Sequence, residues 1–86
     1  MSQKQENSKV AERMLSLYSR LLVGEVITCQ QWANQMKISA RSASRDFARL
    51  KLWLSDEMMY SGEYKEIVFS KERGGYIMIT AQQYHS

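Results

Sequence analysis

The chain has 86 residues, of which 44% are hydrophobic and 24% are charged, so it is long enough for one domain with a small core and is not fully disordered. Its single cysteine, Cys29, excludes an internal disulfide, and no apolar run is long enough to span a membrane. The polar stretch at residues 1–9 lacks the apolar region of a signal peptide, and we therefore expect a cytoplasmic protein.

The net charge of +3 is distributed unevenly. Residues 37–51 carry five basic side chains and one acidic side chain, whereas residues 52–86 carry more acidic than basic groups. A short basic segment is typical of an element that contacts a polyanion such as DNA, although a solvated helix face has the same charge pattern.

A first helix is predicted over residues 9–23. Its apolar residues follow at spacings of four, three and four, as one stripe of an α-helix requires: Val10, Met14, Leu17 and Leu21. Ser8 is a suitable N-cap, and Gly24 lies where a left-handed residue ends a helix. Residues 1–8 have no apolar periodicity, and we expect them to form a flexible tail.

Two further helices follow, joined by a tight turn. Residues 28–31 read Thr-Cys-Gln-Gln, a capping box that predicts a short helix ending near Lys37. Ser39 is expected to cap a third helix over about residues 40–53, and the end of this helix falls between residues 53 and 60. Two short helices joined in this way form a helix-turn-helix unit.

A β-hairpin is predicted after the helices. Residues 64–70 are rich in aromatic and β-branched residues, residues 71–75 form a turn, and residues 76–80 form the returning strand. An isolated hairpin is marginally stable in water, so it must pack against the helices. The sequence therefore predicts a mostly α fold with a small β-hairpin (α+β). This is a winged helix-turn-helix of three helices and a two-stranded wing over residues 9–80, with a tail at residues 81–86.

Four segments of this sequence resemble the N-terminal winged helix-turn-helix domain of DeoR-type repressors and WYL-domain regulators. They are a leucine-rich first helix ending in Gly-Glu, the segment V-I-T-C-Q-Q-W-A, the segment I-S-A-R-S-A-S-R-D-F, and the segment K-E-R-G-G-Y. The chain departs from the family pattern at Lys37, where the family has glycine and where a left-handed backbone would strain a lysine. Ala43 replaces a larger core residue, and Ser44 replaces an arginine.

The third helix, read as a recognition helix, is the element expected to enter the major groove of DNA. Arginines there suit the paired acceptors of guanine, and the helix starts and the wing tip suit phosphates. The candidate DNA-binding residues are Thr28, Gln30, Ser39, Arg41, Ser42, Ser44, Arg45, Arg49, Lys71 and Arg73. Asp46 is expected to orient Arg45 or Arg49, or to cap a neighbouring helix. The alternative interpretation of these residues is a solvated face with simple helix caps.

No set of residues predicts an enzyme. His85 has no metal-ligand spacing with Cys29, and the sequence contains no nucleophile–base pair and no phosphate-cradling glycine loop. A helix start can lower the pKa of a thiol such as that of Cys29, but no histidine base is near in sequence, and we do not expect a catalytic thiol. We predict no cofactor and no metal site.

The predicted function is sequence-specific binding of double-stranded DNA by a small transcriptional repressor, acting as a homodimer on an inverted repeat. The dimer surface is left open among the first helix, the Met58 region and the C-terminal tail. The small size suits a phage or another mobile element.

Two alternatives remain: a winged-helix module that binds and inhibits a host or partner protein, and an architectural DNA-binding domain without sequence preference. DNA binding requires Arg41, Arg45 and Arg49 to be exposed together. Protein binding favours an exposed apolar patch around Trp53, Met58 and Met59.

Overall fold

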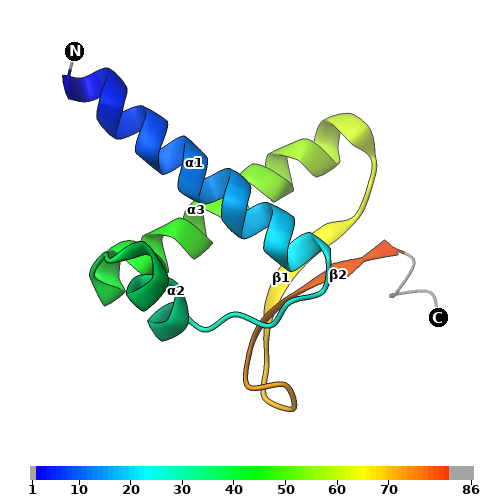
Figure 1. The fold of residues 1–86 in the computed structure, drawn as a ribbon. Coiled ribbons are helices and arrows are strands. Elements are labelled where there is room, and N and C mark those ends of the chain that lie inside the picture. The colour runs from blue at the N-terminus through cyan, green and yellow to red at the C-terminus, as the bar shows by residue number, and fades with distance from the viewer. Residues whose placement is uncertain (1, 82–86) are drawn as a thin grey trace.

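The computed structural model of the chain describes residues 2–81. Three helices precede one antiparallel hairpin in the order α1 (Ser2–Leu22), α2 (Cys29–Met36), α3 (Ala40–Ser61), β1 (Lys65–Ser70) and β2 (Gly75–Thr80) (Figure 1). The predicted α+β architecture is confirmed, and the fold is winged-helix-like.

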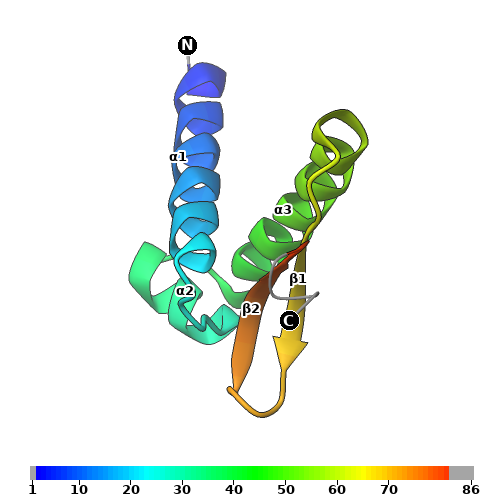
Figure 2. The same cartoon turned by 90° about the vertical axis from the view of Figure 1, so that its right-hand side faces the viewer.

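The helices α1 and α3 diverge like the arms of a V (Figure 2). The helix α2 and the turn of the hairpin lie at the closed end of the V, away from the N-terminal half of α1 and the C-terminal half of α3. The core lies where the helices and the hairpin meet and contains Leu17, Leu21, Ile27, Trp32, Ala33, Ala43, Phe47, Leu50, Leu54, Ile67 and Met78. Within residues 2–81, no helix combines the length and the apolar character that crossing a membrane requires.

The helix α1 begins earlier than predicted. It starts at Ser2, so the expected flexible tail over residues 1–8 is helical from its second residue. The segment 2–8 contains glutamine, lysine and glutamate and no glycine or proline, so it can extend the helix without an apolar stripe of its own. The expected C-terminal tail, residues 81–86, lies outside the described residues except for Ala81.

Helix α1 ends as its sequence predicts. Gly24 has a φ of 98°, in the left-handed region, and its N–H donates to the carbonyl of Leu21 (3.0 Å). The N–H of Glu25 donates to the carbonyl of Arg20 (3.1 Å). This pair of bonds is the Schellman motif, which satisfies carbonyls left free by the last turn.

The turn between α2 and α3 contains a strained residue. The capping box is present at the start of α2, where Gln31 N–H donates to Thr28 Oγ1 (3.0 Å) and Thr28 N–H donates to Gln31 Oε1 (3.1 Å). At the other end of α2, Lys37 adopts φ 56° and ψ 46°, and it is the one non-glycine residue with positive φ in the described chain. The strain expected for a lysine at this point is therefore present.

The helix α3 is longer than the predicted 40–53. It continues to Ser61 and ends at Gly62, whose φ is 76° and whose N–H donates to the carbonyl of Met58 (2.9 Å). Its last turns are mostly exposed, with Met59 86% exposed. The predicted end was too early because residues 54–61 contain no helix breaker, and propensity continues the helix beyond its buried stripe.

The two glycines before Tyr76 have different roles in the hairpin. Gly74 has a φ of 77°, which the turn requires. A Cβ on Gly75 would lie 2.9 Å from Val26 Cγ1, so a side chain there would collide with the α1–α2 connector. This close approach lets Ile27 and Tyr76 exchange two backbone hydrogen bonds of 3.1 and 2.8 Å. The connector thus joins the edge of the hairpin.

Aromatic contacts pack the hairpin against α3. Phe69 lies opposite Tyr76 in the antiparallel register, with ring centroids 5.4 Å apart in an edge-to-face arrangement. Tyr76 stacks on Phe47 of α3 at 4.6 Å. The ammonium of Lys51 lies 5.3 Å from the centroid of Tyr76. The wing is therefore fixed against α3.

The carboxylate of Asp46 connects all three helices. It is 0% exposed and accepts hydrogen bonds from Arg13 Nε (2.8 Å) and Nη2 (3.2 Å) on α1, and from Trp32 Nε1 (2.9 Å) on α2. Arg49 Nη1 on α3 lies 3.5 Å away. The bonds to Asp46 raise the pKa of the Arg13 guanidinium. Asp46 was expected to orient Arg45 or Arg49, and of these two it contacts Arg49 at the longest distance. Its main partners are Arg13 and Trp32, which were not predicted.

We expect Lys37→Gly to raise the free energy of unfolding by about 1 kcal/mol, because glycine adopts the left-handed backbone without the steric cost that lysine has. Urea denaturation followed by tryptophan fluorescence measures the change. Lys37→Ala is the matched control, since it removes the side chain and keeps the strain. Equal effects of the two substitutions would show that backbone strain is not the cause.

Candidate DNA interface

Three arginines lie along the outer face of α3. Arg41, Arg45 and Arg49 follow at intervals of four residues, so they form a row on one side of the helix. All three are exposed, while the opposite side of α3 carries the core residues Ala43 and Phe47. The exposure that a DNA-reading helix requires is present. Ser44, also exposed, lies beside this row.

The first turn of α3 is capped by serine. Ser39 Oγ accepts from the N–H of Ser42 (3.1 Å) and donates to Ser42 Oγ (3.1 Å). Ser39 is exposed and Ser42 is half-buried. Free amides at a helix start attract anions, so a phosphate would be favoured at this turn.

The two residues predicted to contact DNA at the start of α2, Thr28 and Gln30, differ in how accessible their side chains are. The backbone and hydroxyl of Thr28 both take part in the capping box, as the simpler interpretation of this residue expects. The side chain of Gln30 is exposed to solvent. Gln30 is therefore the more accessible of the pair.

The wing carries the remaining predicted residues. Lys71 and Arg73 are exposed in the turn between β1 and β2, with Glu72 between them. The turn is ordered by Ser70, whose carbonyl accepts from Gly74 N–H (2.8 Å) and whose hydroxyl accepts from Arg73 N–H (3.2 Å). Figure 2 shows this turn at the same end of the molecule as α2. Because only residues 37–39 separate α2 from α3, the start of α3 also lies near α2.

Two further cations, Lys37 and Lys51, lie near these residues but were not among the predicted DNA-binding residues. Lys37 is exposed in the turn just before α3. Lys51 is exposed on the side of α3 that faces the wing, over the ring of Tyr76. Both belong to the basic segment 37–51, and that charge count was the signal that could have identified them.

The free thiol of Cys29 lies at the start of α2. It is half-buried, and burial raises the pKa of the thiol, while the nearby charge of Lys51 acts weakly in the opposite direction. The lowering that a helix start can cause does not prevail here, because desolvation of the thiolate outweighs the favourable electrostatics. Among residues 9–81, whose side chains the structure describes, no three histidine, cysteine, aspartate or glutamate side chains group as metal ligands.

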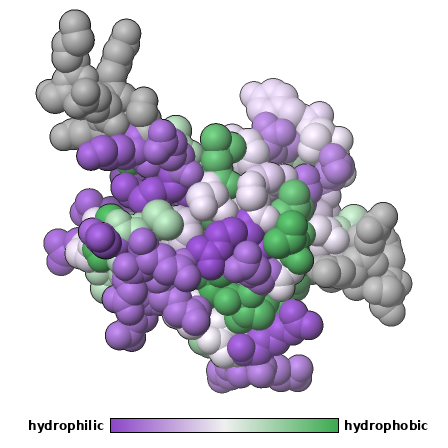
Figure 3. Space-filling view, viewed as in Figure 1, coloured by the Kyte–Doolittle hydropathy of each residue, from purple (hydrophilic) through white to green (hydrophobic). Residues whose placement is uncertain are grey.

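A second surface is apolar and lies between α1 and α3. This groove is lined by Ala11, Met14, Leu15, Tyr18, Leu50 and Trp53. Leu15 is 68% exposed, and Trp53 packs edge-to-face against Tyr18 at 5.5 Å. Hydrophobic side chains reach the surface between α1 and α3 and at the C-terminal end of α1 (Figure 3). An apolar surface of the kind that protein binding favours is therefore present, but of the predicted residues Trp53, Met58 and Met59 only Trp53 lines it, and Leu15 was not predicted.

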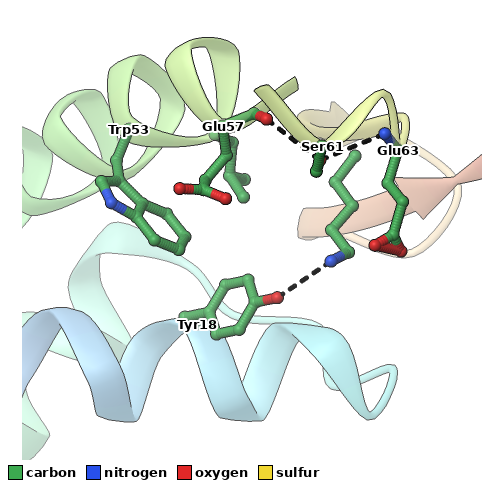
Figure 4. Close-up of a pocket in the computed structure, with 7 residues that line it drawn as sticks. Tyr18, Trp53, Glu57, Ser61 and Glu63 are labelled. Carbon is green, nitrogen blue, oxygen red and sulfur yellow. Dashed lines mark hydrogen bonds between the residues drawn. The ribbon is translucent and has the colours of Figure 1, made fainter. Parts of the chain in front are cut away.

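A small polar pocket lies beside this groove, between α1, α3 and the start of β1 (Figure 4). Lys65 Nζ donates to the hydroxyl of Tyr18 (3.2 Å), and this bond, with the charges of Glu63 and Glu57, raises the pKa of the Lys65 ammonium. Figure 4 shows Trp53 and Glu57 on α3 facing Tyr18 across the pocket. The hydrogen bond between Lys65 and Tyr18 therefore joins the start of β1 to α1 across this pocket.

The predicted residues thus form three groups, at the start of α2, in the N-terminal half of α3 and in the wing turn, and all of them are exposed except the half-buried Thr28 and Ser42. No family model, curated protein or solved structure matches the chain. What this surface does must follow from its own residues and geometry.

We expect the thiol of Cys29 in the folded protein to react with iodoacetamide more slowly than free cysteine at neutral pH. A raised pKa leaves less thiolate at that pH, and the rate should rise only above the usual titration range of a thiol. Mass spectrometry of the alkylated protein over a pH series measures the rate, and the urea-unfolded chain is the control. A folded-state rate above that of free cysteine would contradict this assignment.

Proposed function

We propose that this chain binds double-stranded DNA through the outer face of α3 and acts as a small transcriptional regulator. One observation carries the proposal: Arg41, Arg45 and Arg49 form an exposed row on a helix whose other side is fixed in the core. An α-helix fits the major groove of B-DNA, and arginine can donate two hydrogen bonds to guanine O6 and N7. Ser44 adds a hydroxyl that can donate to or accept from a base edge.

The groups around α3 suit phosphates. Lys37 lies in the turn before α3, and the capped starts of α2 and α3 present free amides. Lys71 and Arg73 extend on the wing. Contacts of this kind orient a protein on the duplex without reading its sequence.

The resemblance to DeoR-type and WYL-domain regulators agrees with this proposal. Each residue of the Gly-Gly-Tyr segment has a structural role here: Gly74 makes the turn, Gly75 allows the α1–α2 connector to approach the strand, and Tyr76 stacks on α3. The segment that resembles the family's wing is therefore the segment that forms the hairpin here. Ser44 in place of an arginine removes one long donor, so the preferred DNA sequence should differ from those that the family reads.

A homodimer that reads an inverted repeat is part of the proposal, since two modules would supply the specificity that one lacks. We assign its interface to the groove that contains Leu15 and Trp53. This groove is apolar, and it lies between the arms of the V rather than on the arginine row of α3.

Sedimentation equilibrium should give a dimer, and Leu15→Glu should give a folded monomer. A wild-type monomer at all concentrations would contradict the dimer.

Fluorescence anisotropy with the DNA upstream of the coding sequence and with scrambled duplex, over a salt series, tests the proposal. We expect binding that favours the upstream DNA and weakens steeply with salt. Arg41→Ala combined with Arg45→Ala should reduce affinity at least ~10-fold, the cost of losing one good base contact. Lys9→Ala is the control for the loss of one exposed cation from α1 rather than from α3, and it should reduce affinity much less.

The other outcomes separate the alternatives. Equal affinity for both duplexes would indicate an architectural protein without sequence preference. No binding even at low salt would overturn the DNA proposal. The exposed apolar groove would then favour a protein-interaction module that inhibits a partner.

A further inference from the structure

Two arginines share the carboxylate of Asp46, and they are bound unequally. Arg13 makes two hydrogen bonds of 2.8 and 3.2 Å, and its side chain is 20% exposed. Arg49 makes one contact of 3.5 Å, at the limit for a hydrogen bond, and its side chain is 48% exposed. The bond to Arg13 is the stronger of the two because it is bidentate and better shielded.

Asp46 does not need Arg49. A buried carboxylate must be paired with a charge and hydrogen-bonded, and Arg13 and the indole N–H of Trp32 provide both. The departure of Arg49 would leave the remaining three bonds to Asp46 in place. Arg49 is thus the arginine of the exposed row that can change partner without leaving a buried charge unpaired.

We propose that Arg13 is a positioning residue for DNA binding, an inference that rests on the proposed function. By neutralising Asp46 from α1, Arg13 leaves the guanidinium of Arg49 able to transfer from the carboxylate to a DNA phosphate. Without Arg13, Arg49 becomes the one remaining cation among the partners of Asp46, and the carboxylate holds it back from DNA. A residue on α1, outside the row of α3, therefore controls how many arginines reach the duplex.

The salt dependence of binding tests this inference. We expect Arg49→Gln to reduce the slope of log affinity against log salt by about one, the value for one lost phosphate contact. Arg13→Gln should reduce the slope by a similar amount, and the double variant should show no further loss. Arg13→Lys should recover part of the slope, because it returns a cation to Asp46. Lys9→Gln, an exposed α1 control, should leave the slope unchanged.

Additive losses in the double variant would overturn the inference, because they would mean that Arg13 acts on DNA independently of Arg49. An unchanged slope in Arg13→Gln or in Arg49→Gln would overturn it as well. If wild-type protein does not bind duplex DNA, the proposed function fails together with this inference. Wild-type binding with an unchanged Arg49→Gln slope overturns the inference alone.

A second measurement does not depend on whether Arg13→Gln folds. The side-chain Nε–H resonances of the arginines and the indole N–H of Trp32 can be followed by NMR in wild-type protein. Duplex DNA should shift the Arg49 resonance and leave those of Arg13 and Trp32 nearly unchanged. Equal shifts of the Arg13 and Arg49 Nε–H resonances, or an Arg49 resonance that does not shift, would contradict the unequal binding of the two arginines to Asp46 on which the inference depends.

Discussion

The buried carboxylate of Asp46 is the interaction on which the arrangement of the helices depends. A charge removed from water is tolerated only when partners neutralise it and occupy its lone pairs, and here those partners come from α1 and α2. Arg13 and Trp32 therefore fix two helices relative to the third through one group. An apolar residue at position 46 could fill the space but could not specify which side chains meet there.

This constraint lies on the same helix as the proposed function. One side of α3 contributes Phe47 and Leu50 to the core, and the other side carries the arginine row. Asp46 lies at the boundary between these sides and touches Arg49 on the exposed one. The wing is placed by the same helix, since Tyr76 stacks on Phe47. The packing of α3 and its proposed contact with DNA thus depend on residues adjacent in sequence.

Much of the fold could be predicted because its signals are local. Helix periodicity, the Thr28 capping box and the glycine-rich turn each act within a few residues, and all three are present in the structure. The early start of α1 and the late end of α3 were missed because residues 2–8 and 55–61 show no apolar stripe at helical spacing in the sequence. The role of Asp46 was missed because its partners lie 33 and 14 residues away, and no pattern links them. The direction of the pKa shift of Cys29 does not follow from its position at a helix start, because tertiary packing decides how far the thiol is buried.

The central claim, that α3 and the wing form a duplex-DNA surface, is tested most directly by an NMR titration of labelled protein with short duplex DNA. The account predicts that amide shifts concentrate in residues 28–31, 37–51 and 71–74, and that the groove around Leu15 and Trp53 shifts little. An absence of shifts at low salt, or shifts centred on the groove, would contradict it.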